Sequence, residues 1–298
     1  MPHDLGENDW TALLRRIKNG TCTPFLGAGA CYGVLPLGNE VAKSWAKQYG
    51  YPLQDSDDLA RVAQFLAVGI DAMFPKEEIA QRFKEAPSPQ FTEDDEPHRV
   101  LASLPLPVYM TTNYDDFMER ALQAVDRTPH PELCPWNKLV SRRPSVRADR
   151  EFEPTVQNPI VFHLHGHTDV PESLVLTEDD YLDFLVSLSK DKAQLLKPRI
   201  QDAMTGSSLL FLGYGIRDWD FRVLFRGLVE YLEISTSRSH VSVQLVPGEG
   251  PLSPDESQKT QEYLERYFEK LDIRVYWGTC RQFAAELSKR WSDFERAN

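Results

Sequence analysis

The stretch TPFLGAG, residues 23–29, decides how this chain is expected to fold. Its first four residues are mostly apolar, and the turn that follows contains Gly27 and Gly29. We interpret it as a buried strand that ends in a glycine turn, since glycine allows a sharp bend and a close backbone approach. Five further runs have the same character: LPVYMTTN (106–113), PIVFHLHG (159–166), SLLFLGYG (208–215), HVSVQLV (240–246) and DIRVYW (272–277).

Amphipathic stretches lie between these apolar runs. Apolar residues at helical spacing predict helices around 10–17, 41–49, 59–66, 115–125, 221–228, 255–271 and 280–294. Asn39 is the expected N-cap of the second helix. Strands that alternate with helices predict an α/β fold, with a Rossmann-like parallel sheet and helices on both faces.

Two segments depart from this alternation. Residues 127–159 hold six prolines, which predicts irregular structure or short edge strands. Residues 85–97, EAPSPQFTEDDEP, are acidic and contain proline, which predicts an exposed loop. The basic stretch 138–150 is interpreted as a solvated loop, with contact to an acidic subunit or to nucleic acid as the alternative.

Composition restricts the class of protein. The 298 residues carry a formal net charge of -12, which disfavours sequence-independent nucleic-acid binding by this chain. The N-terminal sequence has no signal-peptide pattern, and no apolar run approaches the roughly 20 residues of a membrane helix. The four cysteines form no CxxC pair, which disfavours a disulfide framework or a zinc module. We therefore expect a cytoplasmic protein with reduced thiols.

Four of the expected strands end in polar or glycine-rich sequence: GAGA, TTNYDD, HLHGH and GYGIRD. Core packing does not require such residues. In an open parallel sheet, ligands bind at the carboxyl ends of the strands, near the point where strand order reverses. The four endings therefore predict one ligand site.

The two glycine endings each permit two interpretations. The turn Gly27-Ala28-Gly29, with Gly33 following, departs from the strict dinucleotide fingerprint. It is suited either to a bound pyrophosphate or to a tight turn. In the later ending, Asp218 is expected to cap the following helix, and Arg217 to reach a phosphate or an acid.

The polar endings supply candidate catalytic groups. Asn113 offers a donor and an acceptor for a water or a sugar hydroxyl, whereas Asp115 or Asp116 would suit a helix N-cap. The histidines at 163, 165 and 167 alternate and would share one face of a strand. The pattern favours one catalytic base over zinc, with structural roles for His163 and His167.

Taken in order, GAGAC, TTNYD, LHG and LGYG resemble the motifs of the sirtuin superfamily. The form is most similar to the sirtuin-like domains of bacterial antiphage defence proteins, which also carry a segment like LTEDDY. The resemblance implies a single NAD-binding domain over 1–298, with a helical insertion at about 37–104. It places the following residues at the NAD site: Gly27, Ala28, Gly29, Thr111, Asn113, Asp115, His165, Gly213 and Tyr214.

This chain departs from the protein deacylases of that superfamily. It lacks their four-cysteine zinc module, and Cys31 replaces the serine of their GAGxS motif. The resemblance to the defence members implies an NAD glycohydrolase that yields ADP-ribose and nicotinamide without a metal. The alternatives are an NAD-dependent deacylase and a non-catalytic module that binds NAD or ADP-ribose.

The resemblance also implies a mechanism and a setting. Asn113 would position water or a ribose hydroxyl, and His165 would act as the base on either of them. Asp115 would orient the ribose or Asn113, and would stabilise the developing positive charge. The enzyme would deplete NAD as an antiphage effector, in the manner of abortive infection. Its control is expected to come from homo-oligomerisation or from a partner such as a HerA-type hexameric ATPase.

Overall fold

Seven parallel strands form one sheet in the computed structural model, in the order β3-β4-β2-β1-β5-β6-β7. The structure describes residues 5–143, 152–190, 196, 198–215, 240–245 and 254–297. The strands are β1 (Cys22–Leu26), β2 (Val108–Thr111), β3 (His130–Leu133), β4 (Ile160–His163), β5 (Ser208–Leu212), β6 (His240–Gln244) and β7 (Ile273–Trp277). The expected parallel α/β fold is confirmed.

All six predicted strands are present, and β3 adds a seventh at the edge of the sheet. It lies in the proline-rich region and pairs with β4 alone among the described strands. Pro131 is tolerated there because an edge strand leaves one row of backbone groups unpaired. The expectation of short edge structure in this region is therefore confirmed.

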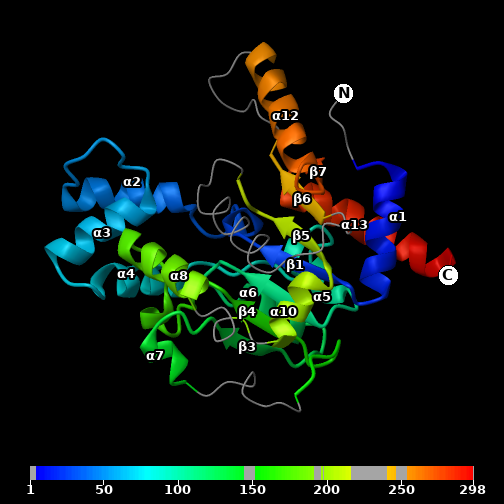
Figure 1. Cartoon of the computed structure of the whole chain (residues 1–298), viewed down its shortest axis with the longest axis horizontal. Helices are drawn as coiled ribbons and strands as arrows, with labels where there is room; N and C mark the ends of the chain where they lie inside the picture. The colour runs from blue at the N-terminus through cyan, green and yellow to red at the C-terminus, as the bar shows by residue number, and fades with distance from the viewer. Residues whose placement is uncertain are drawn as a thin grey trace.

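Helices flank the sheet in the described ranges (Figure 1). Their bounds are α1 (Glu7–Lys18), η1 (Ala28–Cys31), α2 (Gly38–Tyr49), α3 (Leu59–Gly69), α4 (Phe74–Glu85), α5 (Pro97–Ser103), α6 (Phe117–Gln123), α7 (Lys138–Ser141), η3 (Pro171–Ser173), α8 (Glu178–Lys190), α10 (Pro198–Thr205), α12 (Pro254–Glu269) and α13 (Cys280–Ala297). The helix expected at 221–228, with Arg217 and Asp218, lies outside the described residues, as does most of the basic stretch 138–150.

One predicted cap is wrong. Helix α2 begins at Gly38 with Leu37 as its N-cap, so Asn39 lies inside the first turn. The side chain of Glu40 accepts a hydrogen bond from the Leu37 backbone N–H at 2.7 Å. A carboxylate at this position satisfies a free donor and favours the positive end of the helix dipole, so no side-chain oxygen is needed at the cap itself.

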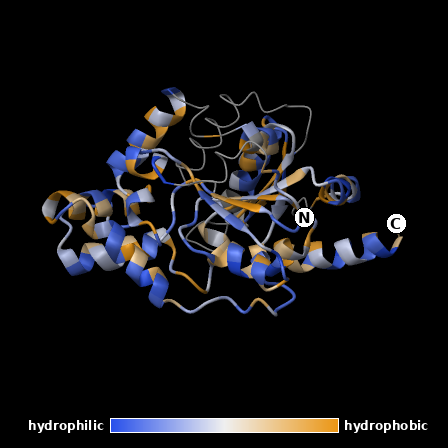
Figure 2. Cartoon of the chain, turned by 90° about the horizontal axis from the view of Figure 1, so that it is seen from below, coloured by the Kyte–Doolittle hydropathy of each residue, from blue (hydrophilic) through white to orange (hydrophobic). Residues whose placement is uncertain are grey.

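Side chains alternate between the two faces of the sheet, as β1 shows. Phe25 belongs to a core covered by α8, α10 and α12, whereas Leu26 belongs to a core covered by α1, α5, α6 and α13. Figure 2 shows hydrophobic colour along the strands and mixed colour on the outer helices. Phe283, Leu287 and Trp291 of α13 are buried in the second core, as their spacing predicted.

Helices α2, α3 and α4 form a separate core beside the sheet, to the left in Figure 1. Trp45, Val62 and Ile79 pack there against Leu174 and Leu176, which precede α8. A largely buried ion pair of 2.7 Å, between Lys76 of α4 and Asp180 of α8, also joins the two segments. Within the segment 37–104, helix α5 instead packs against the sheet.

The segment between α4 and α5 is less exposed than its acidic sequence predicted. Glu96 is only 2% exposed, because its side chain caps α5 and hydrogen-bonds His98. The expected exposed loop is therefore wrong at its C-terminal end.

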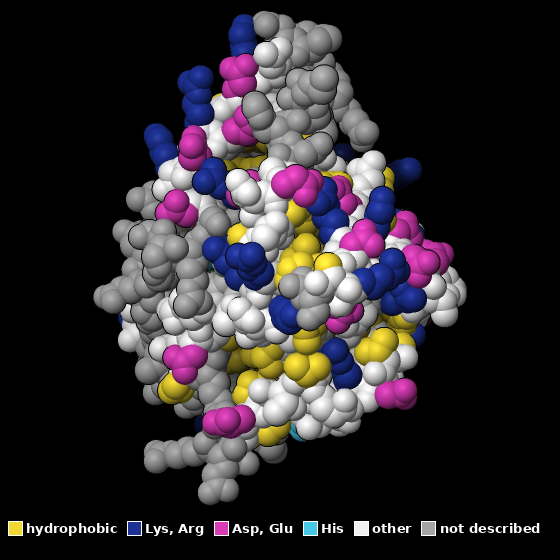
Figure 3. Space-filling model, turned by 90° about the vertical axis from the view of Figure 1, so that its right-hand side faces the viewer, with side chains coloured by type: hydrophobic (Ala, Val, Ile, Leu, Met, Phe, Trp, Pro, Cys, Tyr) yellow, Lys and Arg dark blue, Asp and Glu magenta, His cyan; other side chains and the backbone are white. Residues whose placement is uncertain are grey.

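The face in Figure 3 carries interspersed basic and acidic side chains over its described part. No helix among the described residues is long and apolar enough to cross a membrane.

Candidate functional site

The candidate site lies at the carboxyl ends of β1, β2, β4 and β5. Strand β1 pairs with β2 on one side and with β5 on the other. The chain builds β2 and β4 on the first side and then crosses to the second to form β5. This reversal is the topological switch point at which open α/β sheets bind ligands.

The glycine turn after β1 packs directly on the end of β5. Backbone N–H groups of Gly27 and Gly29 donate to the carbonyls of Leu212 at 2.8 Å and Gly213 at 2.9 Å. A Cβ on Gly27 would lie 2.8 Å from the Tyr214 ring. Contact between two strand ends therefore accounts for the glycines, as the tight-turn interpretation requires. Exposed Ala28 stands between them, and pyrophosphate binding by this turn stays a prediction.

Gly213 has a restricted backbone. Its φ is +82°, a conformation that residues with a Cβ rarely adopt. A Cβ at this position would lie 2.3 Å from the backbone nitrogen of Ala30. The contact holds the 3-10 turn η1 against the end of β5.

The backbone carbonyl of Leu26 ties three strand ends together. It accepts a hydrogen bond from the Tyr214 hydroxyl at 2.7 Å and one from the Thr111 hydroxyl at 3.3 Å. The Tyr214 hydroxyl also contacts Thr112 Oγ1 at 2.9 Å. Thr111 Oγ1 accepts from the Asn113 backbone N–H at 2.9 Å. Thr111 and Tyr214 thus hold the loop that carries Asn113.

Asn113 is fixed through its amide nitrogen. Nδ2 donates to the Gly27 carbonyl at 3.1 Å and contacts Cys31 Sγ at 3.2 Å. Among the described residues, no hydrogen bond engages its Oδ1. The side chain is half-buried, so the structure orients this oxygen without occupying it.

Asp115 faces the protein rather than solvent and is 8% exposed. Its Oδ1 accepts from the Phe117 backbone N–H at 3.0 Å, at the start of α6. Its Oδ2 accepts from Cys31 Sγ at 3.3 Å. Asp115 therefore performs the capping contact expected of Asp115 or Asp116, and the Asp116 side chain makes no cap bond. It shares Cys31 as a partner with Asn113.

His165 and Asn113 follow the ends of the neighbouring strands β4 and β2 at equivalent positions. The register of β2 and β4 pairs Thr111 with His163, and each candidate lies two residues further on. Contact with Tyr181 and Phe184 buries the His165 ring, with ring centroids 5.5 and 5.2 Å away. Burial lowers the pKa of His165 to about 3, so the imidazole is neutral near pH 7.

We expected the three histidines to share one face of a strand, but the structure shows a different arrangement. Strand β4 ends at His163, and Gly166 adopts a φ of +90° beyond it, so that expectation is wrong. His163 is fully buried, with Nε2 bonded to Glu119 of α6 and Nδ1 lying 3.4 Å from the Asn113 carbonyl. His167 accepts the Asp169 backbone N–H at Nδ1, at 3.0 Å.

Mutual attraction keeps His163 and Glu119 charged although both side chains are buried. Burial disfavours the imidazolium, but the charge of Glu119 and its hydrogen bond outweigh it and raise the pKa of His163. Burial also opposes the carboxylate, yet the charge of His163 lowers the pKa of Glu119. The pair lies beneath the Asn113 loop and supports a structural role for His163. Sequence reasoning missed Glu119, whose signal was its place on the helix after TTNYDD.

Sequence reasoning also missed two residues beside Cys31. His98 Nε2 lies 3.9 Å from Cys31 Sγ, and His98 Nδ1 lies 2.7 Å from Glu96 Oε1. All three side chains are buried. Helix α5 brings the pair to the η1 turn, 67 positions away in the chain. No local spacing could have shown this contact.

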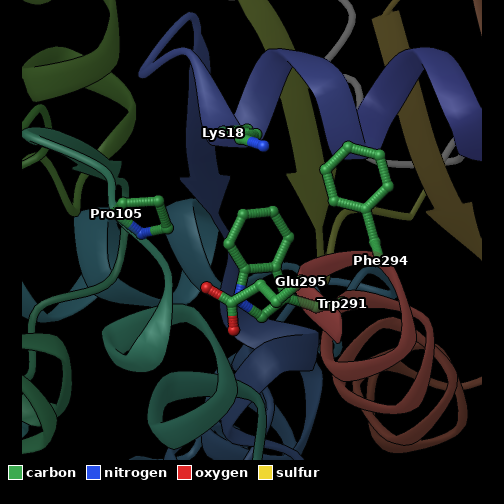
Figure 4. Close-up of a pocket in the computed structure, with 5 residues that line it drawn as sticks. All are labelled: Lys18, Pro105, Trp291, Phe294 and Glu295. Carbon is green, nitrogen blue, oxygen red and sulfur yellow. The ribbon is translucent and has the colours of Figure 1, made fainter. Parts of the chain in front are cut away.

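A hollow in the described surface lies at the opposite end of the sheet. Its lining residues are Lys18, Pro105, Trp291, Phe294 and Glu295 (Figure 4). Lys18 and Pro105 precede β1 and β2, so the hollow is near the amino ends of these strands. Its volume of about 190 Å³ is below the roughly 300 Å³ of common ligand pockets. It is not part of the candidate site.

The fold and its strand-end residues define a Rossmann-like α/β protein with a candidate ligand site at the switch point. The family model of the SIR2-like domain matches residues 107–276, which is more than half of the chain. The chain belongs to this family of SIR2-like domains.

Two curated relatives match about 70% of the chain. An NAD(+) hydrolase ThsA of Enterococcus faecium is 27% identical over 220 residues, covering 70% of this chain and 41% of that protein. The NAD(+) hydrolase ThsA of Cytobacillus dafuensis is 24% identical over 217 residues, covering 71% and 39%. The match thus spans about two fifths of the length of these relatives.

Proposed function

We propose that this chain is an NAD glycohydrolase that cleaves NAD to ADP-ribose and nicotinamide. The family match and the NAD(+) hydrolase names of the relatives support this substrate. The observation that carries the proposal is the orientation of Asn113. Its Nδ2 is bonded to Gly27 and Cys31, and its Oδ1 remains available to a water or a ribose hydroxyl.

The chemistry requires an oriented nucleophile beside a base. Cleavage of the nicotinamide–ribose bond builds oxocarbenium-like positive charge on the sugar. Neutral nicotinamide leaves with the bonding electron pair, and water adds to the same ribose carbon. His165 accepts the proton that this water loses, which its neutral imidazole permits. Asp115 acts as a positioning residue, because both its oxygens bond the protein.

Six residues are proposed to bind NAD: Gly27, Ala28, Gly29, Thr111, Gly213 and Tyr214. Their place at the switch point supports this assignment. Gly27, Gly29 and Gly213 shape the turn, while Thr111 and Tyr214 hold the Asn113 loop. NAD is the substrate, and the proposed mechanism assigns no step to a metal.

Release of nicotinamide from NAD by the purified protein tests the proposal. We expect Asn113→Ala and His165→Ala each to abolish release. Matched controls are Asn158→Ala, since Asn158 lies in the turn before β4, and His130→Ala on edge strand β3, which should retain it. Full activity in both site variants would disprove the residue assignment. Release of O-acetyl-ADP-ribose with an acetylated peptide would instead identify a deacylase.

The proposed cellular role is that of a cytoplasmic antiphage effector that depletes NAD, as in abortive infection. The motif resemblance to sirtuin-like defence proteins supports it. We further propose control through a homo-oligomer or a HerA-type hexameric ATPase, with nucleic acid engaged only through such a partner. Nicotinamide release with and without the co-purified ATPase, and NAD levels in infected cells, test these points. An active lone chain unaffected by the ATPase would exclude it as a regulator.

A further inference from the structure

We propose that Cys31, His98 and Asp115 form a binding site for a thiophilic divalent cation, for which Zn²⁺ is the best match. The three potential ligand atoms lie within 4.8 Å of one another, and all three residues are buried. They come from the η1 turn, helix α5 and the loop after β2. Sulfur, imidazole nitrogen and carboxylate oxygen are the ligand types that zinc uses in proteins.

The separations of these atoms suit a tetrahedral ion. Zinc bonds of about 2.3 Å to sulfur and about 2.0–2.2 Å to nitrogen or oxygen would place neighbouring ligands about 3.5 Å apart. The Cys31 sulfur lies 3.3 Å from Asp115 Oδ2 and 3.9 Å from His98 Nε2. The ligand atoms of His98 and Asp115 lie within 4.8 Å of each other, so an ion bound to the sulfur would draw them closer.

Glu96 prepares His98 for this role. Its Oε1 lies 2.7 Å from His98 Nδ1, and its Oε2 accepts the Arg99 backbone N–H at 2.6 Å. A proton held at Nδ1 leaves the lone pair of Nε2 directed toward Cys31 in the neutral ring. Carboxylate–histidine–metal arrangements of this kind orient the ligand and increase its basicity.

The other two ligands keep their structural contacts when an ion binds. Asp115 holds the Phe117 backbone N–H with Oδ1, which leaves Oδ2 for the metal. The ion replaces the thiol proton between Cys31 and Asp115, and this proton is released to solvent. Asn113 Nδ2 still donates to the resulting thiolate.

A second cluster of possible ligands, Glu119, His163 and His167, fits a cation less well. Glu119 already pairs with His163, although its Oε2 has no hydrogen-bond partner among the described residues. His167 accepts the Asp169 backbone N–H at Nδ1, which in a neutral ring places the proton on Nε2. Metal binding there would have to break both arrangements, whereas in the Cys31 cluster the contacts of Asp115 with Phe117 and of Glu96 with His98 stay in place.

Co²⁺ titration of the chelator-treated full chain tests the site. Cobalt replaces zinc in tetrahedral sites and gives a thiolate charge-transfer absorption that zinc lacks. We expect this absorption to saturate at one ion per chain and to disappear when Zn²⁺ is added. Cys31→Ser should abolish the band, and His98→Gln should weaken cobalt binding at least tenfold. The readout is independent of NAD cleavage and hence of the proposed function.

Cys22→Ala is the matched control, because Cys22 is equally buried but lies on β1. It should retain the band, and circular dichroism should show native folding in every variant. Cys31→Ser preserves side-chain volume and a hydroxyl for Asp115, so it is expected to fold. If His98→Gln fails to fold, the absorption band of the wild-type chain and its loss in Cys31→Ser still test the proposed metal site. No thiolate band in the wild type, or an equal band in Cys31→Ser, would overturn the proposal.

Discussion

The side-chain amide of Asn113 donates to the backbone carbonyl of Gly27 at 3.1 Å, and this bond links the ends of β2 and β1. The two residues are 86 positions apart in the chain. The bond fixes which way the amide faces, because only nitrogen can donate to a carbonyl. It therefore sets the direction of Asn113 Oδ1, on which the proposed reaction depends.

Asn113→Asp keeps the size of the side chain and should change only its orientation. The substitution replaces the donor with a carboxylate oxygen that faces the Gly27 carbonyl and the sulfur of Cys31. Repulsion would turn the side chain, and misplacement of about 1 Å can cost about 100-fold in rate. We expect a fall of that order in kcat/KM for NAD, measured by nicotinamide release. Asn158→Asp serves as the charge-matched control, and an unchanged rate in Asn113→Asp would contradict the assigned orientation.

Gly213→Ala should destabilise the fold more than Gly50→Ala. Both glycines have positive φ, at +82° and +70°. A Cβ on Gly213 would lie 2.3 Å from the Ala30 backbone nitrogen, whereas a Cβ on Gly50 would meet no atom of the described residues within 4 Å. The φ penalty is about 1–2 kcal/mol for each. We expect Gly213→Ala to lose at least about 2 kcal/mol more in urea unfolding. Equal losses of unfolding free energy in the two variants would contradict this expectation and show that the ends of β1 and β5 can move apart at little cost.

The buried Glu119–His163 pair should make stability depend on pH. The pKa of His163 is raised from 6.5, so its contribution is complete below about 6.5 and is lost as pH rises through the raised value. The pKa of Glu119 is lowered from 4.5, so its contribution is complete above about 4.5 and is lost on acidification. The Tm difference between wild type and Glu119→Gln should therefore be greatest between about pH 4.5 and 6.5.

Thermal unfolding of both proteins from acid to alkaline pH measures this difference. Subtracting the two curves removes the contributions that do not depend on Glu119, including most of that of the similar Glu96–His98 pair. Breaking a buried pair typically costs about 3–5 kcal/mol, so the change should be resolved easily. A Tm difference that grows steadily above pH 7 would refute a charged His163.

Below neutral pH, the rate of NAD cleavage should not fall with the pKa of an ordinary histidine. Burial lowers the pKa of His165 to about 3, so this residue remains a neutral base well below pH 6.5. We expect kcat/KM to show no protonation of a base near pH 6.5 in a pH–rate profile. A tenfold loss for each unit below pH 6.5, absent from the unfolding curve, would contradict the apolar setting that Tyr181 and Phe184 provide.

Much of the fold could be predicted because the signals were local. Apolar runs such as that ending at Leu26 marked six of the seven described strands, and glycine-rich or polar endings marked the candidate site. The N-cap of α2 was wrong because the Glu40 carboxylate, not Asn39, satisfies the backbone there. The shared histidine face was wrong because the strand stops at His163 and the chain turns at Gly166.

The sequence by itself determined the order of strands and helices and the residue types at each strand end, since periodicity and turn chemistry depend on near neighbours. Only the tertiary structure decided that Cys31 meets His98 and Asp115, and that Glu119 lies beneath the Asn113 loop. These contacts join residues 44 to 84 positions apart. Sheet order and helix packing bring them together, and no local pattern records that proximity.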